Sequence, residues 1–152
     1  MEDLLRMQAL AEEKMKNASH LLLKIYPEVN DPQMLVGISD TIYEAVSSSI
    51  NAAVSLESQM SRLRAAPSSF IDALNQLSRL QKRYSFDPAT KSLLYELHEF
   101  MVEKKNVIKK KESVSYRVPE AKQKIVDTKK VKEYMVAANS VIADIKLKLS
   151  DR

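Results

Sequence analysis

The sequence of 152 residues lacks cysteine and contains a single glycine. Without cysteine the chain has no disulfide, no thiolate nucleophile and no cysteine-ligated zinc. Glycine supplies the positive φ angles of tight hairpins and phosphate-binding loops, so its near absence argues against a sheet-rich fold. Because Gly37 stands alone, neither a dinucleotide-binding fingerprint nor a P-loop can be built around it.

Long apolar runs are also absent. The longest uncharged stretch of helical character, Ala45–Leu56, has 12 residues and is rich in serine, whereas a membrane span needs about 20 apolar residues. The first residues, MEDLLRMQALAEEK, are charged within three positions and include no apolar core of the kind a signal peptide has. We therefore expect a cytoplasmic protein with no membrane partner.

Apolar residues recur every three or four positions along five stretches, which is the period of an amphipathic helix. The predicted helices cover residues 4–25, 32–64, 70–84, 88–105 and 128–149. Small residues dominate the middle of the second helix and let a neighbouring backbone approach closely, so we expect this helix to be the central one. The small residues are Ala45, Ser47, Ser48, Ser49, Ala52, Ala53 and Ser55.

Local signals mark the helix boundaries. Tyr26 before Pro27 is expected to end the first helix, because the residue before a proline avoids the α region. Asp31 is a preferred N-cap, and Pro32 suits the first helical position. Arg62 is expected to lie in the last turn of the second helix, with Arg64. The other three helices are expected to start at N-caps. These are Ser69, with Asp72 three residues later as in a capping box, Asp87, which Pro88 follows, and Thr128.

These patterns predict an all-α fold, an up-and-down antiparallel bundle of about five helices that forms one domain over residues 1–152. Residues 106–127 depart from the helical period. Val114, Tyr116 and Val118 alternate with polar residues, which is the period of a strand. Residues 123–127 are a second candidate strand, with a turn at 119–122, so the segment forms either a small basic β-hairpin or a basic loop before a last helix that starts near residue 119.

Several runs of the chain resemble a group of uncharacterised archaeal helical proteins. In that group a helix ending in Tyr-Pro meets an alanine-rich helix that starts with Asp-Pro, and a basic strand-like segment and a last helix follow. The resemblance implies a fold and no activity. It is carried by His20–Pro27, Asn30–Leu35, Tyr43–Ala45, Ala52, Ala53 and Glu57.

The chain also resembles the higher eukaryote and prokaryote nucleotide-binding (HEPN) helical domains. Active RNases of that group have an Arg separated from a His by four to six intervening residues. The corresponding positions before the two histidines are Glu13, Lys14 and Met15, and Lys91, Ser92 and Leu93. None is Arg, so the resemblance implies a related bundle without that catalytic pair, and a nucleotide-handling enzyme is the lesser alternative.

Catalytic and metal-binding constellations are not evident, and we expect no enzyme activity and no cofactor. His98 lies next to Glu99 and two residues after Glu96, a spacing that does not share a helix face. Glu44 and Glu57 are the only other acids that could join it. His20 falls on the polar side of its helix. We expect both histidines to be solvated or hydrogen-bonded at the edge of the core. The serines lack the glycine-flanked elbow of hydrolases.

Positive charge is concentrated in the last third of the chain. Residues 1–100 carry a net charge of −3 and residues 101–152 carry +7, while the basic segment, residues 104–132, carries +8. Clustered lysines bind phosphates through counterion release, but they also form solvated faces and protect edge strands from aggregation. The candidate polyanion-binding residues are Lys104, Lys105, Lys109, Lys110, Lys111, Arg117, Lys122, Lys124, Lys129, Lys130 and Lys132.

The sequence thus predicts a non-enzymatic interaction or scaffold protein, with binding of RNA or DNA through the basic segment as the alternative. Because only one of the eleven cations is Arg, diffuse charge is favoured over specific recognition. If the hairpin forms, Arg117 faces solvent and Tyr116 anchors the hairpin to the helices. The broad apolar face of the fourth helix suggests a homo-oligomer. Its members are Leu93, Leu94, Leu97, Phe100 and Met101.

Overall fold

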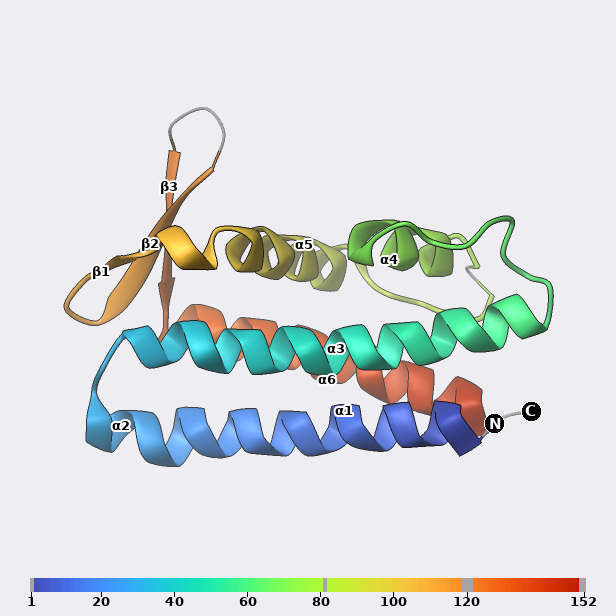
Figure 1. Ribbon diagram of the computed structural model, residues 1–152, viewed down its shortest axis with the longest axis horizontal. Helices are drawn as coiled ribbons and strands as arrows, with labels where there is room; N and C mark the ends of the chain where they lie inside the picture. Colours follow the sequence, from blue (N-terminus) through green and yellow to red (C-terminus); the bar gives the residue numbers. More distant parts are fainter. Residues whose placement is uncertain (1, 81, 119–121, 151–152) are drawn as a thin grey trace.

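A computed structural model describes residues 2–80, 82–118 and 122–150 of the chain. Helices account for 72% of the described residues, and a small antiparallel sheet precedes the last helix (Figure 1). The predicted all-α class is confirmed in its main part, and the predicted hairpin is part of a three-stranded sheet. Of the predicted turn at residues 119–122, residues 119–121 lie outside the described residues, and Lys122 begins the third strand of this sheet.

The helices are α1 (Glu2–His20), the π-helix η1 (Leu21–Ile25), α2 (Tyr26–Val29), α3 (Gln33–Gln59), α4 (Phe70–Ser78), α5 (Pro88–Val102), the short 3-10 helix η2 (Lys104–Asn106) and α6 (Thr128–Ser150). The strands are β1 (Ile108–Lys109), β2 (Ser113–Val118) and β3 (Lys122–Asp127), with β2 in the centre.

The first helix continues past Pro27, where the sequence predicted its end. A proline in a helix interior has no N–H to donate and clashes with the carbonyl four residues earlier. The π-turns of η1 accommodate it, since the Tyr26 N–H donates to the Leu21 carbonyl five residues back. The helix ends instead at Asn30, which adopts the left-handed conformation with φ of 58°.

The small residues of α3 make it the central helix, as the sequence predicted. It packs against α1, α4, α5, α6 and β2, and Ala45, Ala52 and Ala53 are fully buried. A polar bridge joins three helices here. The Ser49 hydroxyl donates to Gln8 Oε1 at 2.7 Å, and Gln8 Nε2 donates to the Ile142 carbonyl at 3.0 Å.

The four long helices α1, α3, α5 and α6 alternate in direction along the chain (Figure 1). α1 begins at the end of the molecule that holds both described termini, while α3 and α6 both begin at the opposite end, beside the sheet (Figure 1). α3 and α6 are in contact along their length and run in the same direction. α5 returns the chain to the end at which α3 starts, and the sheet and the start of α6 follow at that same end (Figure 1).

The predicted caps hold at two helix starts, where Ser69 Oγ accepts from the Asp72 N–H and Asp87 Oδ1 from the Thr90 N–H. At α3 the helix starts one residue later than predicted, with Pro32 as the N-cap, although Asp31 Oδ1 accepts from the Gln33 N–H. At α6 the prediction is off by one residue: Asp127 Oδ1, not Thr128, accepts from the Lys130 N–H.

Two predicted helices are shorter in the structure. α3 ends at Gln59, so Arg62 and Arg64 lie in the connection that follows it, and α4 ends at Ser78. The apolar face of α5 is covered by the chain itself: its members Leu94, Leu97, Phe100 and Met101 are buried. The fifth member, Leu93, is partly buried and packs against the same core.

The central strand explains which residues of the sheet are covered. Ser115 lies opposite Ile108 on β1 and Ile125 on β3. Directly opposite residues share a face of a sheet, so the two isoleucines flank the small serine and it is fully buried, although both are half-exposed themselves. β1 has two residues and no alternation to detect, and the sequence analysis missed it.

No helix in the described part of the chain is both long and apolar enough to cross a membrane.

Candidate nucleic-acid interface

Tyr116 anchors the sheet to the helical body, as the sequence predicted. Its ring is buried and stacks on Phe100 of α5 with ring centroids 5.2 Å apart. Its hydroxyl donates to Glu99 Oε1 at 3.0 Å. Burial raises the pKa of this hydroxyl well above its ordinary value, and the charge of Glu99 adds to the effect. Tyr116 is thus a structural donor and is not available to stack on a nucleic-acid base.

Four lysines of the basic segment form ion pairs with acids of the helical body. They join the segment to α3, to α5 and to the turn before α3. The pairs are Lys104–Asp40 at 3.3 Å, Lys109–Asp31 at 2.7 Å, Lys124–Glu99 at 2.9 Å and Lys130–Glu96 at 3.3 Å, and Lys130 also contacts Glu133 at 3.3 Å. These lysines are committed to holding the sheet and α6 in place.

Burial would lower the pKa of the Lys130 ammonium, but the charge of Glu96 and the hydrogen bonds that the ammonium donates to Glu133 and Glu96 raise it above the ordinary value. Lys130 is therefore charged at neutral pH, and its ion pair with Glu96 joins α6 to α5. It is the most enclosed of the four, with 30% of its side chain exposed.

The other seven cations of the basic segment make no ion pair with the described residues. They are the free cations of the segment: Lys105, Lys110, Lys111, Arg117, Lys122, Lys129 and Lys132. All seven are exposed. Arg117 faces solvent, as predicted.

Four of the free cations come from parts of the segment that the sheet brings together. Lys110 and Lys111 lie in the turn before β2, and the Lys110 N–H donates to the Ser113 carbonyl at 2.8 Å. Ser113 pairs with Asp127, the last residue before α6. Lys129 and Lys132 follow in the first turns of α6. We call Lys110, Lys111, Lys129 and Lys132 the lysine cluster.

An open groove runs beside the lysine cluster, with a volume of about 740 Å³. One wall is formed by Leu23, Tyr26 and Pro27 at the end of the first helix, and the other by the outer face of the sheet with Lys129 and Lys132. Glu112 and Asp127 also line it. Asp127 is used as the cap of α6.

The two histidines serve structural or solvated roles. His20 is exposed. The Tyr43 hydroxyl and His98 Nδ1 are hydrogen-bonded at 2.8 Å, and the His98 ring stacks on Phe70 with an interplanar angle of 5°. Burial lowers the pKa of His98. Among the described residues, no group of three or more His, Asp or Glu side chains is placed to hold a metal ion.

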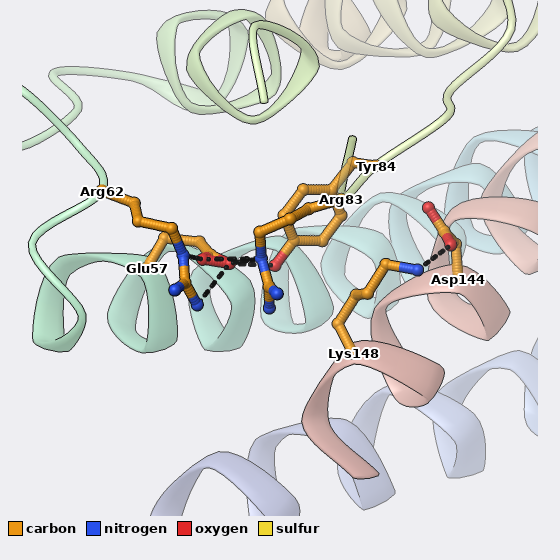
Figure 2. Close-up of polar contacts among 6 residues, drawn as sticks. All are labelled: Glu57, Arg62, Arg83, Tyr84, Asp144 and Lys148. Carbon is orange, nitrogen blue, oxygen red and sulfur yellow. Dashed lines mark hydrogen bonds and ion pairs between the residues drawn. The ribbon is translucent and has the colours of Figure 1, made fainter. Parts of the chain in front are cut away.

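A second charged group was missed by the sequence analysis, which considered Glu57 only as an extra metal ligand. Glu57 of α3 is fully buried. Its carboxylate accepts hydrogen bonds from Arg62 Nε at 2.8 Å, Arg83 Nε at 3.1 Å and the Tyr84 hydroxyl at 3.2 Å (Figure 2). The close-up shows Arg62 and Arg83 on either side of the Glu57 carboxylate, both bonded to it. A second ion pair, Asp144–Lys148 on α6, lies apart from this group.

The charge of Glu57 is maintained by its partners. Burial raises the pKa of this carboxyl, but the hydrogen bonds and charges of Arg62 and Arg83 outweigh burial and hold it below the ordinary value. Burial raises the pKa of the Tyr84 hydroxyl, and the adjacent carboxylate adds to the rise. The available signal in the sequence was the concentration of arginine, since four of the seven arginines fall between residues 62 and 83.

No protein family, curated protein or solved structure was found to match the chain.

Proposed function

We propose that the protein is a non-enzymatic binding module whose ligand is the phosphate backbone of a nucleic acid. The supporting observation is the division of the basic segment into two sets. Four lysines are used to hold the sheet, and seven exposed cations remain without an ion-pair partner among the described residues. Keeping so many like charges on a small surface is costly unless a polyanion compensates them.

The composition of this surface defines how it binds. The free cations are six lysines and Arg117. Lysine ammonium groups are mobile point charges, which suit phosphates at varied positions better than the edges of particular bases. Tyr116 is buried in the anchor, and so contributes no stacking. Binding is therefore sequence-independent and strongly dependent on salt.

The test is fluorescence anisotropy with single-stranded RNA and DNA oligomers at several NaCl concentrations. Lys129→Ala/Lys132→Ala and Lys110→Ala/Lys111→Ala are compared with a matched control, Lys16→Ala/Lys91→Ala, which removes the same charge from α1 and α5. Each variant of the lysine cluster is expected to reduce the slope of log K against log salt by about two units, roughly one per phosphate contact. The control is expected to keep the wild-type slope.

Two results would contradict the proposal. One is the absence of RNA and DNA binding by the wild type at low salt. The other is equal weakening by the control and by the lysine-cluster variants, which would show a response to net charge alone.

A further inference from the structure

The end of the molecule far from the sheet carries a different kind of basic group. The connection after α3 and the end of α4 bring together Arg62, Arg64 and Arg79, and all three line a pocket of about 500 Å³. Gln76 also lines the pocket, and Leu63 and Leu80 give it apolar walls. Pockets of this size hold small molecules rather than single ions.

Arg62 is fixed in place by a contact outside the pocket. Its Nε donates to the fully buried carboxylate of Glu57 at 2.8 Å and its Nη2 approaches the same carboxylate at 3.5 Å. Its Nη1 has no hydrogen-bond partner in the described part of the chain. The buried carboxylate therefore orients one edge of the guanidinium and leaves the outer nitrogen free for a ligand, which lowers the entropic cost of binding.

Arg64 and Arg79 supply the remaining donors. Both are exposed, and neither forms an ion pair with a residue that the structure describes. The nearby acid Asp72 accepts from the Ser68 N–H at 2.9 Å and from Gln76 at 3.2 Å. Its pKa is lowered mainly by the Ser68 hydrogen bond, with the charge of Arg79 as the smallest contribution.

The charges of this region do not cancel. Four arginines, Arg83 included, stand against the two carboxylates of Glu57 and Asp72, which leaves a surplus of two positive charges. Guanidinium groups present fixed pairs of N–H donors that match the oxygens of a phosphate, whereas lysine offers a point charge. A phosphomonoester has about two negative charges near neutral pH, and its organic part would contact Leu63 and Leu80.

We propose that Arg62, Arg64 and Arg79 form a binding site for a phosphomonoester group. The site does not depend on nucleic-acid binding by the lysine cluster, because the two groups lie at opposite ends of the molecule. The phosphomonoester can belong to a small molecule or to the 5′ end of an RNA, and the same three arginines would recognise either.

The experiment measures binding of inorganic phosphate, phenyl phosphate and a short RNA with or without a 5′ phosphate by isothermal titration calorimetry at constant ionic strength. Phenyl phosphate or the 5′-phosphorylated RNA is expected to bind saturably, and the tighter of the two identifies the source of the group. Arg64→Ala/Arg79→Ala is expected to weaken this binding by about tenfold or more for each lost arginine. Neither side chain supports the fold, and an unchanged unfolding temperature checks this.

Two further variants separate a shaped site from diffuse charge. Lys16→Ala/Lys24→Ala removes the same charge at distant exposed positions of α1 and η1 and is expected to leave phosphate binding unchanged. Arg64→Lys/Arg79→Lys keeps the charge but loses the paired donors, and is expected to weaken binding by about tenfold. No saturable phosphate binding by the wild type, full affinity in the lysine variant, or equal losses in the distant control would each overturn the proposal.

Discussion

The two ends of the molecule carry positive charge in different ways. At the sheet end, lysines follow strands and a turn, and the four that pair each meet acids of the helical body at partly exposed positions. At the opposite end, Arg62 and Arg83 converge on one fully buried carboxylate, Glu57 (Figure 2). The first arrangement distributes charge over a surface, and the second concentrates it around a point.

This difference separates what each end contributes to stability and to binding. An exposed Lys–carboxylate pair contributes about 0–1 kcal/mol and is screened by salt. Removing one member of a buried ion pair leaves the charge of the other uncompensated, which is strongly destabilising. The Glu57 group is therefore required for the structure of the connections that follow α3 and α4. The free lysines can therefore be changed with little effect on the fold and each paired lysine at a cost of no more than about 1 kcal/mol, whereas the loss of Glu57 costs more.

The largest effect is expected from Glu57→Gln. The amide removes the negative charge and leaves Arg62 and Arg83 without compensation, which should lower the free energy of unfolding by about 3 kcal/mol. Asp40→Asn, which breaks the exposed Lys104 pair, should lower it by no more than about 1 kcal/mol. Urea unfolding followed by circular dichroism measures both. Equal losses in the two variants would remove the distinction between the ends.

A smaller effect is expected from exchanging the cation types. Arg83→Lys keeps the charge but cannot direct a guanidinium edge at Glu57, and should cost about 1–2 kcal/mol of unfolding free energy. Lys109→Arg, at the exposed pair with Asp31, should change it by less than about 0.5 kcal/mol. If thermal unfolding shows Arg83→Lys to be as neutral as Lys109→Arg, the geometry at Glu57 has no energetic importance.

The pH dependence should show the smallest difference. The arginines hold the pKa of Glu57 below its ordinary value of 4.5, so its folded pKa is lower than its unfolded one. Its contribution to stability is therefore complete above pH 4.5 and is lost as the pH falls toward the folded pKa. Wild-type stability should fall as the pH drops below about 4.5, and less steeply in Glu57→Gln. Parallel curves for the two proteins would contradict this.

The sequence was sufficient to predict the parts of the fold that depend on local pattern. The period of three and four residues located the four long helices, and the alanines and serines of α3 identified its central position. Strand alternation at Val114, Tyr116 and Val118 indicated β2 and its anchor. Pro27 was misinterpreted, because the local rule for proline takes no account of a π-turn that removes the clash.

The remaining features depend on contacts between distant residues. The burial of Ser115 requires the register that places Ile108 and Ile125 on either side of it. Glu57 and Arg83 are 26 residues apart, and they meet only because the α4–α5 connection folds back on α3. Of the eleven candidate binding cations, the sequence could not distinguish the four that hold the sheet from the seven that remain free, since their partners lie on other elements.

The most direct test of the nucleic-acid surface is a titration of ¹⁵N-labelled protein with a single-stranded RNA lacking a 5′ phosphate, followed through the backbone amide signals. Our account predicts shifts at Lys110, Lys111, Lys129 and Lys132, on both sides of the Ser113–Asp127 pair, that disappear as NaCl is raised. The amides of residues 62–80 should remain unchanged in the same titration. Shifts confined to residues 62–80, or none at low salt, would contradict the assignment of the lysine cluster as the binding surface.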